Sequence, residues 1–313
     1  FDKIDFVEQE GSAPDRVVLV VQVQEKSTGS INFSIGYSTT DVIVGSVSLQ
    51  ERNFLGKGYD VKIDTTASWY RQNINFSFTN PYFMGLPIAA GIDVFATNLD
   101  NQEQSNYNSQ LYGFALRTGF RIDDNSALSL KYGLTWRDVN GIDKSQAAPA
   151  VIESQGQTLK SAVSGTYTWD NLDNPVRPTN GFRGQVEGEI AGLGGDVHYA
   201  RLSGEARAYY PVSEKITFVA RAAGGTVMGW GGQDVRLMDL FYKGGETIRG
   251  FNNLGYGPRD LATGNALGGH HYWTTTAELR FPLPLVPDDL GMTGAVFADA
   301  GSLFGAGNRA KQL

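Results

Sequence analysis

The stretch Leu128-Ser129-Leu130-Lys131-Tyr132-Gly133-Leu134-Thr135-Trp136-Arg137 decides the fold class of this chain. Apolar residues occupy every even position from 128 to 136, and polar residues or glycine lie between them. Side chains on a β-strand point alternately to opposite faces, so this stretch predicts a strand with one apolar and one polar face. The same two-residue period returns along most of the chain, which therefore predicts an all-β fold.

The alternation continues on both sides of this stretch, for example from Ile31 to Tyr37, from Tyr59 to Trp69 and from Phe182 to Ile190. It favours strands, and no convincing helix is expected between them. We expect about thirteen strands, near residues 29–38, 41–52, 58–70, 72–80, 87–98, 109–122, 125–138, 159–170, 181–193, 196–210, 214–228, 268–282 and 290–300.

Composition narrows the class of protein. A net charge of −7 argues against a nucleic-acid surface. The absence of cysteine excludes disulfides and thiolate metal sites. No apolar run approaches the length of a membrane-spanning helix. Frequent glycine and aromatic residues with a two-residue period are typical of a bacterial outer-membrane barrel.

The lengths of the connections support a barrel. If the N-terminal residues are periplasmic, the three longest connections, 98–110, 138–160 and 229–267, all lie on the outer side. The opposite side has tight turns such as 53–57, 121–125 and 211–215. Short turns on one side and long loops on the other are typical of outer-membrane barrels. The alternative is a large soluble sandwich with an aromatic core.

Residues 1–26 form a separate segment, with the boundary to the barrel domain, residues 27–313, at residue 27. We expect two strands, 1–9 and 16–26, around the turn at residues 11–15. The run from Val17 to Val21 is apolar on both faces, which suits burial under helices. The segment resembles the tail of a small α/β module. Because Phe1 opens within a strand-like pattern without a signal peptide, we expect that the N-terminus has been cut away.

A glycine-rich connection runs from Gly229 to Gly269 and contains Gly-Gly-Glu-Thr-Ile-Arg-Gly-Phe at residues 244–251. It also carries apolar residues that a solvated linker would lack, so we expect it to pack against something. An arginine between glycines can approach a partner closely and donate two hydrogen bonds to a carboxylate. The expected role of Arg249 is therefore carboxylate binding.

Six motifs in one order resemble the BamA family, which assembles outer-membrane barrels. They are Asn53-Phe54-Leu55-Gly56-Lys57-Gly58, Thr79-Asn80-Pro81-Tyr82-Phe83, Asp173-Asn174-Pro175 with Pro178-Thr179-Asn180-Gly181, Phe241-Tyr242-Lys243-Gly244-Gly245, Ile248-Arg249-Gly250-Phe251, and Phe297-Ala298-Asp299-Ala300-Gly301.

The resemblance implies a transmembrane antiparallel β-barrel of the 16-stranded type in the bacterial outer membrane. About thirteen strands would be present here, and the C-terminal strands would be missing, as in a fragment. It also implies that residues 1–26 are the end of the last periplasmic POTRA domain.

The family pattern places the loop motif, with Gly245, Ile248, Gly250 and Phe251, inside the lumen. Strand parity directs Glu278 and Asp299 to the same lumen, where two neighbouring carboxylates repel unless a cation lies between them. Arg249 is the expected cation. The alternative is that both acids line a wet lumen and Arg249 is solvated.

Other candidate sites are weaker. Paired carboxylates also serve acid–base catalysis, but no nucleophile accompanies these two, so we expect no enzyme. His270 and His271 are adjacent on an expected strand and point to opposite faces, which disfavours a shared metal ion. The chain has no P-loop pattern. We therefore expect no metal, no cofactor and no ATP.

The first strand of the barrel is the expected lateral gate, because in BamA-like proteins it pairs weakly with the last strand. Its openable edge could template an incoming strand. The gate residues are Gly29, Ser30, Ile31, Asn32, Phe33, Ser34, Ile35, Gly36 and Tyr37.

These features predict an insertase for outer-membrane proteins. Its expected partners are unfolded outer-membrane proteins, the assembly-machine lipoproteins and the lipid bilayer, and no nucleic acid. The alternatives are a TamA-like assembly factor, a two-partner secretion transporter and, more distantly, a passive porin.

Overall fold

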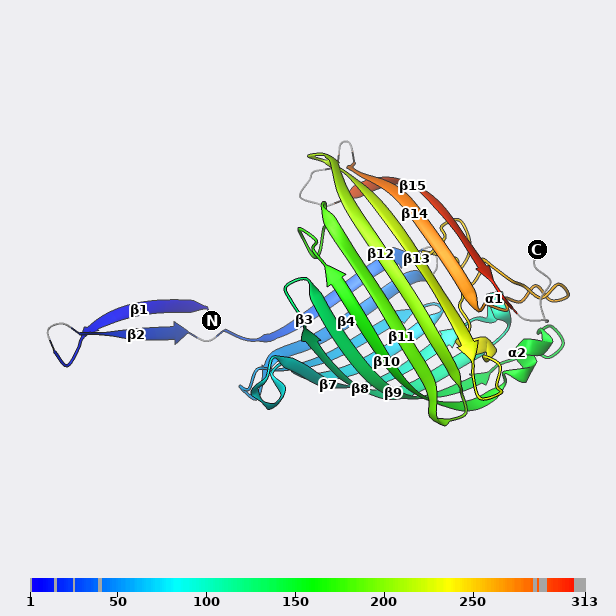
Figure 1. The fold of residues 1–313 in the computed structure, drawn as a ribbon, viewed down its shortest axis with the longest axis horizontal. Coiled ribbons are helices and arrows are strands. Elements are labelled where there is room, and N and C mark those ends of the chain that lie inside the picture. The colour runs from blue at the N-terminus through cyan, green and yellow to red at the C-terminus, as the bar shows by residue number, and fades with distance from the viewer. Residues whose placement is uncertain are drawn as a thin grey trace.

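The computed structural model describes residues 2–13, 16–24, 26–38, 41–283, 286 and 292–306. Its fifteen strands form two separate antiparallel sheets. The first sheet is a ribbon of β1 (Lys3–Glu10) and β2 (Val17–Gln24), which projects away from the rest of the molecule in Figure 1. The other thirteen strands form one sheet, here called the wall, which curves around a central space, the lumen (Figure 1).

Each strand of the wall pairs antiparallel with the next along the chain, so β3 and β15 are its two edges among the described residues. This confirms the predicted all-β fold with thirteen antiparallel strands. The strands are β3 (Gly29–Ser38), β4 (Val42–Phe54), β5 (Tyr59–Ser68), β6 (Arg71–Asn80), β7 (Ile88–Asp100), β8 (Asn108–Arg121), β9 (Ser126–Asn140), β10 (Gly156–Asp170), β11 (Gly181–Gly195), β12 (Tyr199–Ser213), β13 (Ile216–Gly229), β14 (His271–Pro282) and β15 (Thr293–Phe304).

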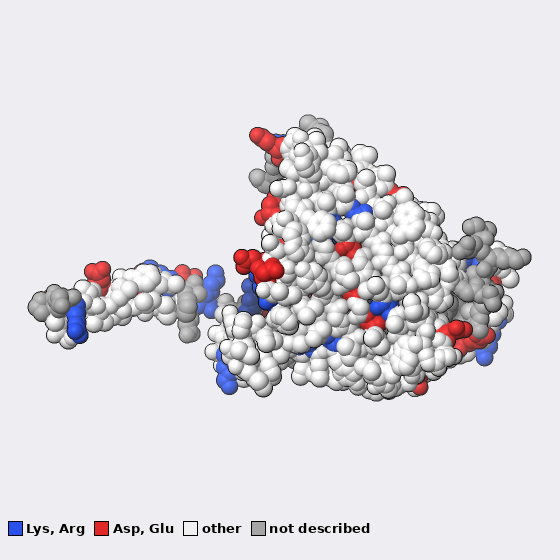
Figure 2. Space-filling model, viewed as in Figure 1, with Lys and Arg blue, Asp and Glu red and all other residues white. Residues whose placement is uncertain are grey.

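The two faces of the wall differ because each strand alternates. On β12, Leu202 and Tyr210 are exposed on the outer face, whereas Tyr199 and Tyr209 are buried on the inner face. The antiparallel register extends this parity to neighbouring strands, since Leu202 lies opposite Thr226 of β13. Most of the charged side chains visible in Figure 2 lie toward the ends of the wall or on the ribbon. The outer face is therefore mainly apolar.

The connections also differ between the two ends of the wall. Residues 55–58, 122–125 and 214–215 form tight turns at the end near the ribbon. The two longest connections between described strands, residues 141–155 and 230–270, lie at the opposite end together with residues 101–107, where α1 (Gln102–Ser105) and α2 (Pro149–Glu153) are seen in Figure 1. None of the helices in the described part of the chain is long and apolar enough to cross a membrane.

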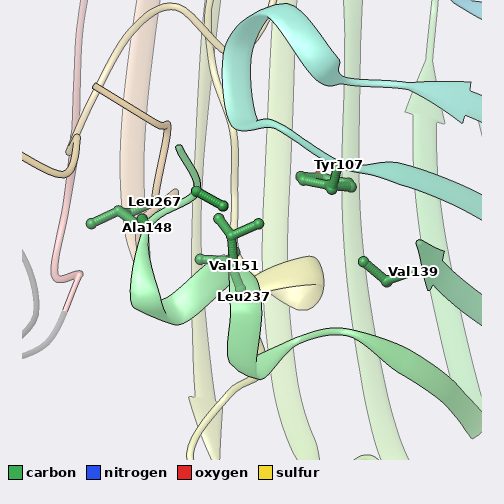
Figure 3. Close-up of a cluster of buried hydrophobic side chains, with 7 residues drawn as sticks. Tyr107, Val139, Ala148, Val151, Leu237 and Leu267 are labelled. Atoms are coloured by element: carbon green, nitrogen blue, oxygen red, sulfur yellow. The ribbon is translucent and has the colours of Figure 1, made fainter. Parts of the chain in front are cut away.

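A cluster of buried side chains, here called the cap, lies among the connections at this end of the wall (Figure 3). Its residues come from strand β9 and from all three long connections: Tyr107, Val139, Ala147, Ala148, Val151, Leu237 and Leu267. Burying apolar surface contributes about 25 cal/mol per Å². The cap therefore ties loops that are far apart in the sequence to one another.

No helix covers the β1–β2 ribbon among the described residues. Val17, Leu19 and Val21 of its apolar run are therefore exposed. An isolated two-stranded ribbon has too few neighbours to bury both faces. Pro14 and Asp15 of the expected turn lie outside the described residues.

Candidate functional site

The connection between β13 and β14, residues 230–270 and here called the long loop, folds back into the lumen. It begins with a single turn of 3-10 helix, η2 (Leu237–Asp239). Three isolated antiparallel bridges then hold it in shape, between Phe241 and Gly269, Lys243 and Tyr256, and Arg259 and Ala266. Since its backbone is paired with itself, the loop can hold a side chain in a fixed direction.

A tight turn at Gly244–Gly245 presents Arg249. Gly244 has a φ of +125°, and a Cβ there would lie 2.2 Å from the carbonyl oxygen of Asn252. Only glycine fits such a position without strain. The N–H of Gly245 donates to the carbonyl of Phe251 at 2.8 Å, and the hydroxyl of Thr247 donates to the carbonyl of Gly244 at 2.8 Å. This turn therefore explains the paired glycines of the motif.

Arg249 binds two carboxylates on neighbouring strands. Its Nε and Nη2 donate to Oδ2 and Oδ1 of Asp299, both at 2.8 Å, and its Nη1 donates to Oε2 of Glu278. Its backbone N–H also donates to Asp299 Oδ2, at 3.0 Å. The guanidinium lies over the ring of Phe297, 3.4 Å from the ring centroid. A fork that fits both oxygens of one carboxylate is the strongest arginine–carboxylate geometry.

The two acids are well shielded from solvent. The side chain of Asp299 is 4% exposed, that of Glu278 is 10% exposed and that of Arg249 is 29% exposed. Asp299 also accepts from the hydroxyl of Thr276 at 2.8 Å, and Glu278 accepts from Nε of Arg280 at 2.6 Å. Two carboxylates and two guanidinium groups balance in charge, which removes the repulsion between the acids.

Strand register places these acids together. Asp299 of β15 lies opposite Thr276 of β14, and Glu278 lies opposite Phe297, so the two acids are diagonal neighbours on the inner face. The structure thus brings together the three residues that the sequence analysis singled out. Sequence reasoning missed Thr276, Arg280 and Phe297, although the parity of β14 and β15 already placed them on the same face.

The other residues of the loop motif support this arrangement. Ile248 is buried against β15, where its Cδ1 would lie 2.9 Å from a Cβ added at Gly301. Gly245 and Gly250 both have positive φ values, +58° and +94°. Phe251 is half-exposed and packs edge-on against Tyr256, whose hydroxyl donates to the carbonyl of Gly301 at 2.6 Å. The motif therefore contacts β15 through both polar and apolar groups.

The predicted gate strand is β3. It pairs with β4 along residues 29–38, and its other side has no strand neighbour among the described residues. Ile31, Phe33, Ile35 and Tyr37 are exposed on one face, Ile35 at 87%. The residues between them, Ser30, Asn32, Ser34 and Gly36, share the other face, and Ser34 Oγ lies 2.6 Å from Ser46 Oγ of β4. The strand thus presents an apolar face beside an unpaired backbone edge.

Each of the two adjacent histidines contacts an oxygen atom of another segment of the chain. Nδ1 of His270 contacts the carbonyl of Gly305, and Nδ1 of His271 lies 2.9 Å from the hydroxyl of Thr226. No group of three or more His, Cys, Asp or Glu side chains within the described ranges is arranged to hold a metal ion.

Comparison with known proteins identifies the family. The profile of the Omp85 superfamily domain matches residues 53–313. The chain is 29% identical over 308 residues to the outer membrane protein assembly factor BamA of Neorickettsia risticii, covering 97% of this chain and 41% of that protein. It is also 29% identical over 290 residues to BamA of Nitratidesulfovibrio vulgaris, covering 92% of this chain and 36% of that protein.

A solved structure has the same fold. The crystal structure of BamA from Haemophilus ducreyi lacking POTRA domains 1–3 superposes with a TM-score of 0.83 at 23% identity, covering 97% of this chain and 63% of that one. The chain spans about two fifths of the length of these two BamA relatives. The thirteen-stranded wall and the superfamily match over residues 53–313 together show that the chain belongs to the Omp85 superfamily and is a homologue of the BamA barrel domain.

Proposed function

We propose that this chain is the barrel part of an outer-membrane protein assembly factor, which inserts unfolded barrel proteins into the membrane. The observation that carries the proposal is the edge of β3, which has no strand neighbour among the described residues and has exposed apolar side chains on one face. An unpaired strand edge is a template for another strand. The relatives named as outer membrane protein assembly factors support the same role.

Backbone pairing would make this recognition tolerant of sequence. An incoming strand that adds to β3 pairs its own N–H and C=O groups, which lipid cannot satisfy. The alternating side chains of β3 would then only select for a strand with an apolar outer face. No P-loop pattern is present, so the free energy would come from substrate folding and from burial of apolar surface in lipid.

The arginine cluster, consisting of Arg249, Glu278 and Asp299, would hold the long loop against β14 and β15. Because the cluster joins the loop to both strands, it would stabilise β15, the last described strand of the wall. We assign it a structural role in the wall and no catalytic role.

In the membrane, the apolar outer face of the wall would contact lipid. The short turns and the ribbon would lie on the periplasmic side and the three long loops outside. Residues 1–26 would be the C-terminal part of the last POTRA domain, which would cover the exposed side chains of β2. Lipoproteins of the assembly machine would be partners of the complete protein.

The test is a site-directed crosslink in the full-length protein, to which residues 1–313 contribute no cysteine of their own. Single cysteines at Ile31, Phe33 and Ile35 should crosslink to a cysteine in the terminal strand of a substrate during assembly. A cysteine at Leu116, which is also exposed but lies on the interior strand β8, is the matched control and should not crosslink. Equal crosslinking at Leu116, or none along β3, would contradict edge templating.

Bilayer conductance distinguishes this function from a passive porin. The long loop and the cap occupy the lumen and its long-loop end, so we expect no large steady open channel. A large steady conductance would favour the porin. The two-partner secretion alternative is distinguished by the substrate that crosslinks, which would be an exported polypeptide for a transporter and an unfolded outer-membrane protein for an assembly factor.

A further inference from the structure

The long loop has a second polar anchor, ten residues before Arg249. Asp239, in η2, is 2% exposed, and its Oδ1 accepts from Nη1 of Arg137 on β9 at 3.0 Å. The backbone carbonyl of Asp239 also accepts from Nη2 of Arg201 on β12. Neither arginine belongs to the motifs that the sequence analysis identified. Arg137 lies on β9, four strands away from β13 in the sheet order, whereas Arg201 lies on β12, beside β13.

The Asp239 anchor depends mainly on Arg137. The second carboxylate oxygen of Asp239 has no hydrogen-bond partner among the described residues. Arg201 is held separately, because its guanidinium lies 5.0 Å from the ring centroid of Tyr199 and 5.1 Å from that of Phe241. A buried carboxylate requires a compensating charge, and Arg137 provides the ion pair.

Other contacts hold the loop on the same side of the lumen. The backbone N–H of Ala148, in the connection between β9 and β10, donates to Oδ1 of Asn265 in the long loop at 2.8 Å. Leu237 and Leu267 of the long loop pack against Val151 of α2 in the cap (Figure 3). The part of the loop around Asp239 is thus fixed to the middle of the wall.

We propose that Asp239 is a positioning residue that makes the long loop a brace across the lumen. One end of the brace is bound to β9 and β12 through Asp239, and the other is bound to β14 and β15 through Arg249. Between these two anchors the chain has a fixed length and its own backbone pairing. The brace limits the movement of the β15 edge relative to β9.

Two anchors that act in series are expected to give non-additive effects when both are removed. If either anchor is released, the brace transmits no restraint, so releasing the second adds little. Independent sites that are more than about 7–10 Å apart normally add in their effects. A merely local structural role for Asp239 would therefore give additive effects, whereas a brace gives non-additive ones.

The test measures the distance between the β15 edge and β9 by electron spin resonance in the full-length protein in lipid, without substrate. Spin labels on cysteines at Leu130 of β9 and Val296 of β15, both exposed on the outer face, report this distance. We expect Asp239→Asn to widen the distance distribution, and Arg249→Ala to widen it about as much. The matched control is Asp260→Asn, because Asp260 accepts hydrogen bonds only within its own turn of the long loop.

The distance distribution of the double variant Asp239→Asn/Arg249→Ala should be no wider than that of the single variant with the wider distribution. The brace proposal would be overturned if the widening in the double variant equalled the sum of the widenings in the two single variants. An unchanged distance distribution in Asp239→Asn would also overturn it. If Asp239→Asn fails to fold, Arg137→Lys keeps the charge and should widen the distribution partly; a distribution as narrow as the wild type would count against the proposal. Because no substrate is present, the result is independent of the proposed assembly function.

Discussion

Replacing Arg249 by alanine should destabilise the wall at its β15 edge. The substitution removes three side-chain hydrogen bonds to Asp299 and Glu278 and leaves both acids without this cation. Breaking a buried ion pair by removing one partner costs about 3–5 kcal/mol. Both acids would then repel each other across neighbouring strands.

The contacts that remain in the variant indicate a loss at or slightly below the lower end of this range. Glu278 would keep Arg280, and Asp299 would keep the hydroxyl of Thr276 and the backbone N–H of residue 249. Arg249 is also 29% exposed, so water screens part of the interaction. We therefore expect a loss of about 2–3 kcal/mol, and roughly half of that for Arg249→Lys, because a lysine cannot donate two parallel hydrogen bonds to Asp299.

Urea unfolding in lipid vesicles measures this loss, and the temperature of the heat-dependent shift on gels provides a second readout. Arg71→Ala is the matched control: Arg71 is exposed at the start of β6, so its effect should stay within about 0.5 kcal/mol. The double variant Arg249→Leu/Asp299→Asn should recover part of the loss, since it leaves no unpaired charge at residue 299. A wild-type stability for Arg249→Ala would refute the reasoning.

Two further predictions concern a turn and a glycine. In the turn after β10, the hydroxyl of Thr179, followed by backbone N–H groups, lowers the pKa of Asp173 to about 2. The folded pKa is below the unfolded one, so the contribution of this turn is present above about pH 4 and is lost as the pH falls through about 2. Hydrogen exchange of residues 171–180 should show this loss, and Asp173→Asn should abolish its pH dependence. Gly301→Val should clash with the carbonyl oxygen of Trp273 and with Ile248 and lower stability by about 1–3 kcal/mol in urea unfolding, whereas Gly188→Val, with open space around it, should be tolerated; equal effects would count against close packing at Gly301.

The local alternation of apolar and polar residues was sufficient to predict the strands of the wall. Alternation at residues such as Leu128 to Trp136 predicted the strands, because burial of one face imposes a two-residue period on the sequence. Strand ends were less accurate: β9 continues to Asn140 and β10 begins at Gly156. The two short helices in the loops were not expected, since four- and five-residue helices leave little periodic signal.

For the candidate site, parity alone placed Glu278 and Asp299 on the inner face, and the loop motif indicated Arg249. The partners Arg280, Thr276 and Phe297 depend on the register between β14 and β15, which the sequence leaves open. Whether the apolar run in β2 is buried or exposed also cannot be read from its own residues, because burial depends on what packs against the strand.

The sequence by itself determined that this chain forms antiparallel strands with an apolar and a polar face, and which charged residues face inward. These properties follow from neighbouring residues, since side-chain direction repeats every two positions. Only the tertiary structure decided that Asp239 of the long loop meets Arg137, 102 positions away in the chain. A contact between distant segments depends on the curvature and register of the whole wall, which no local pattern encodes.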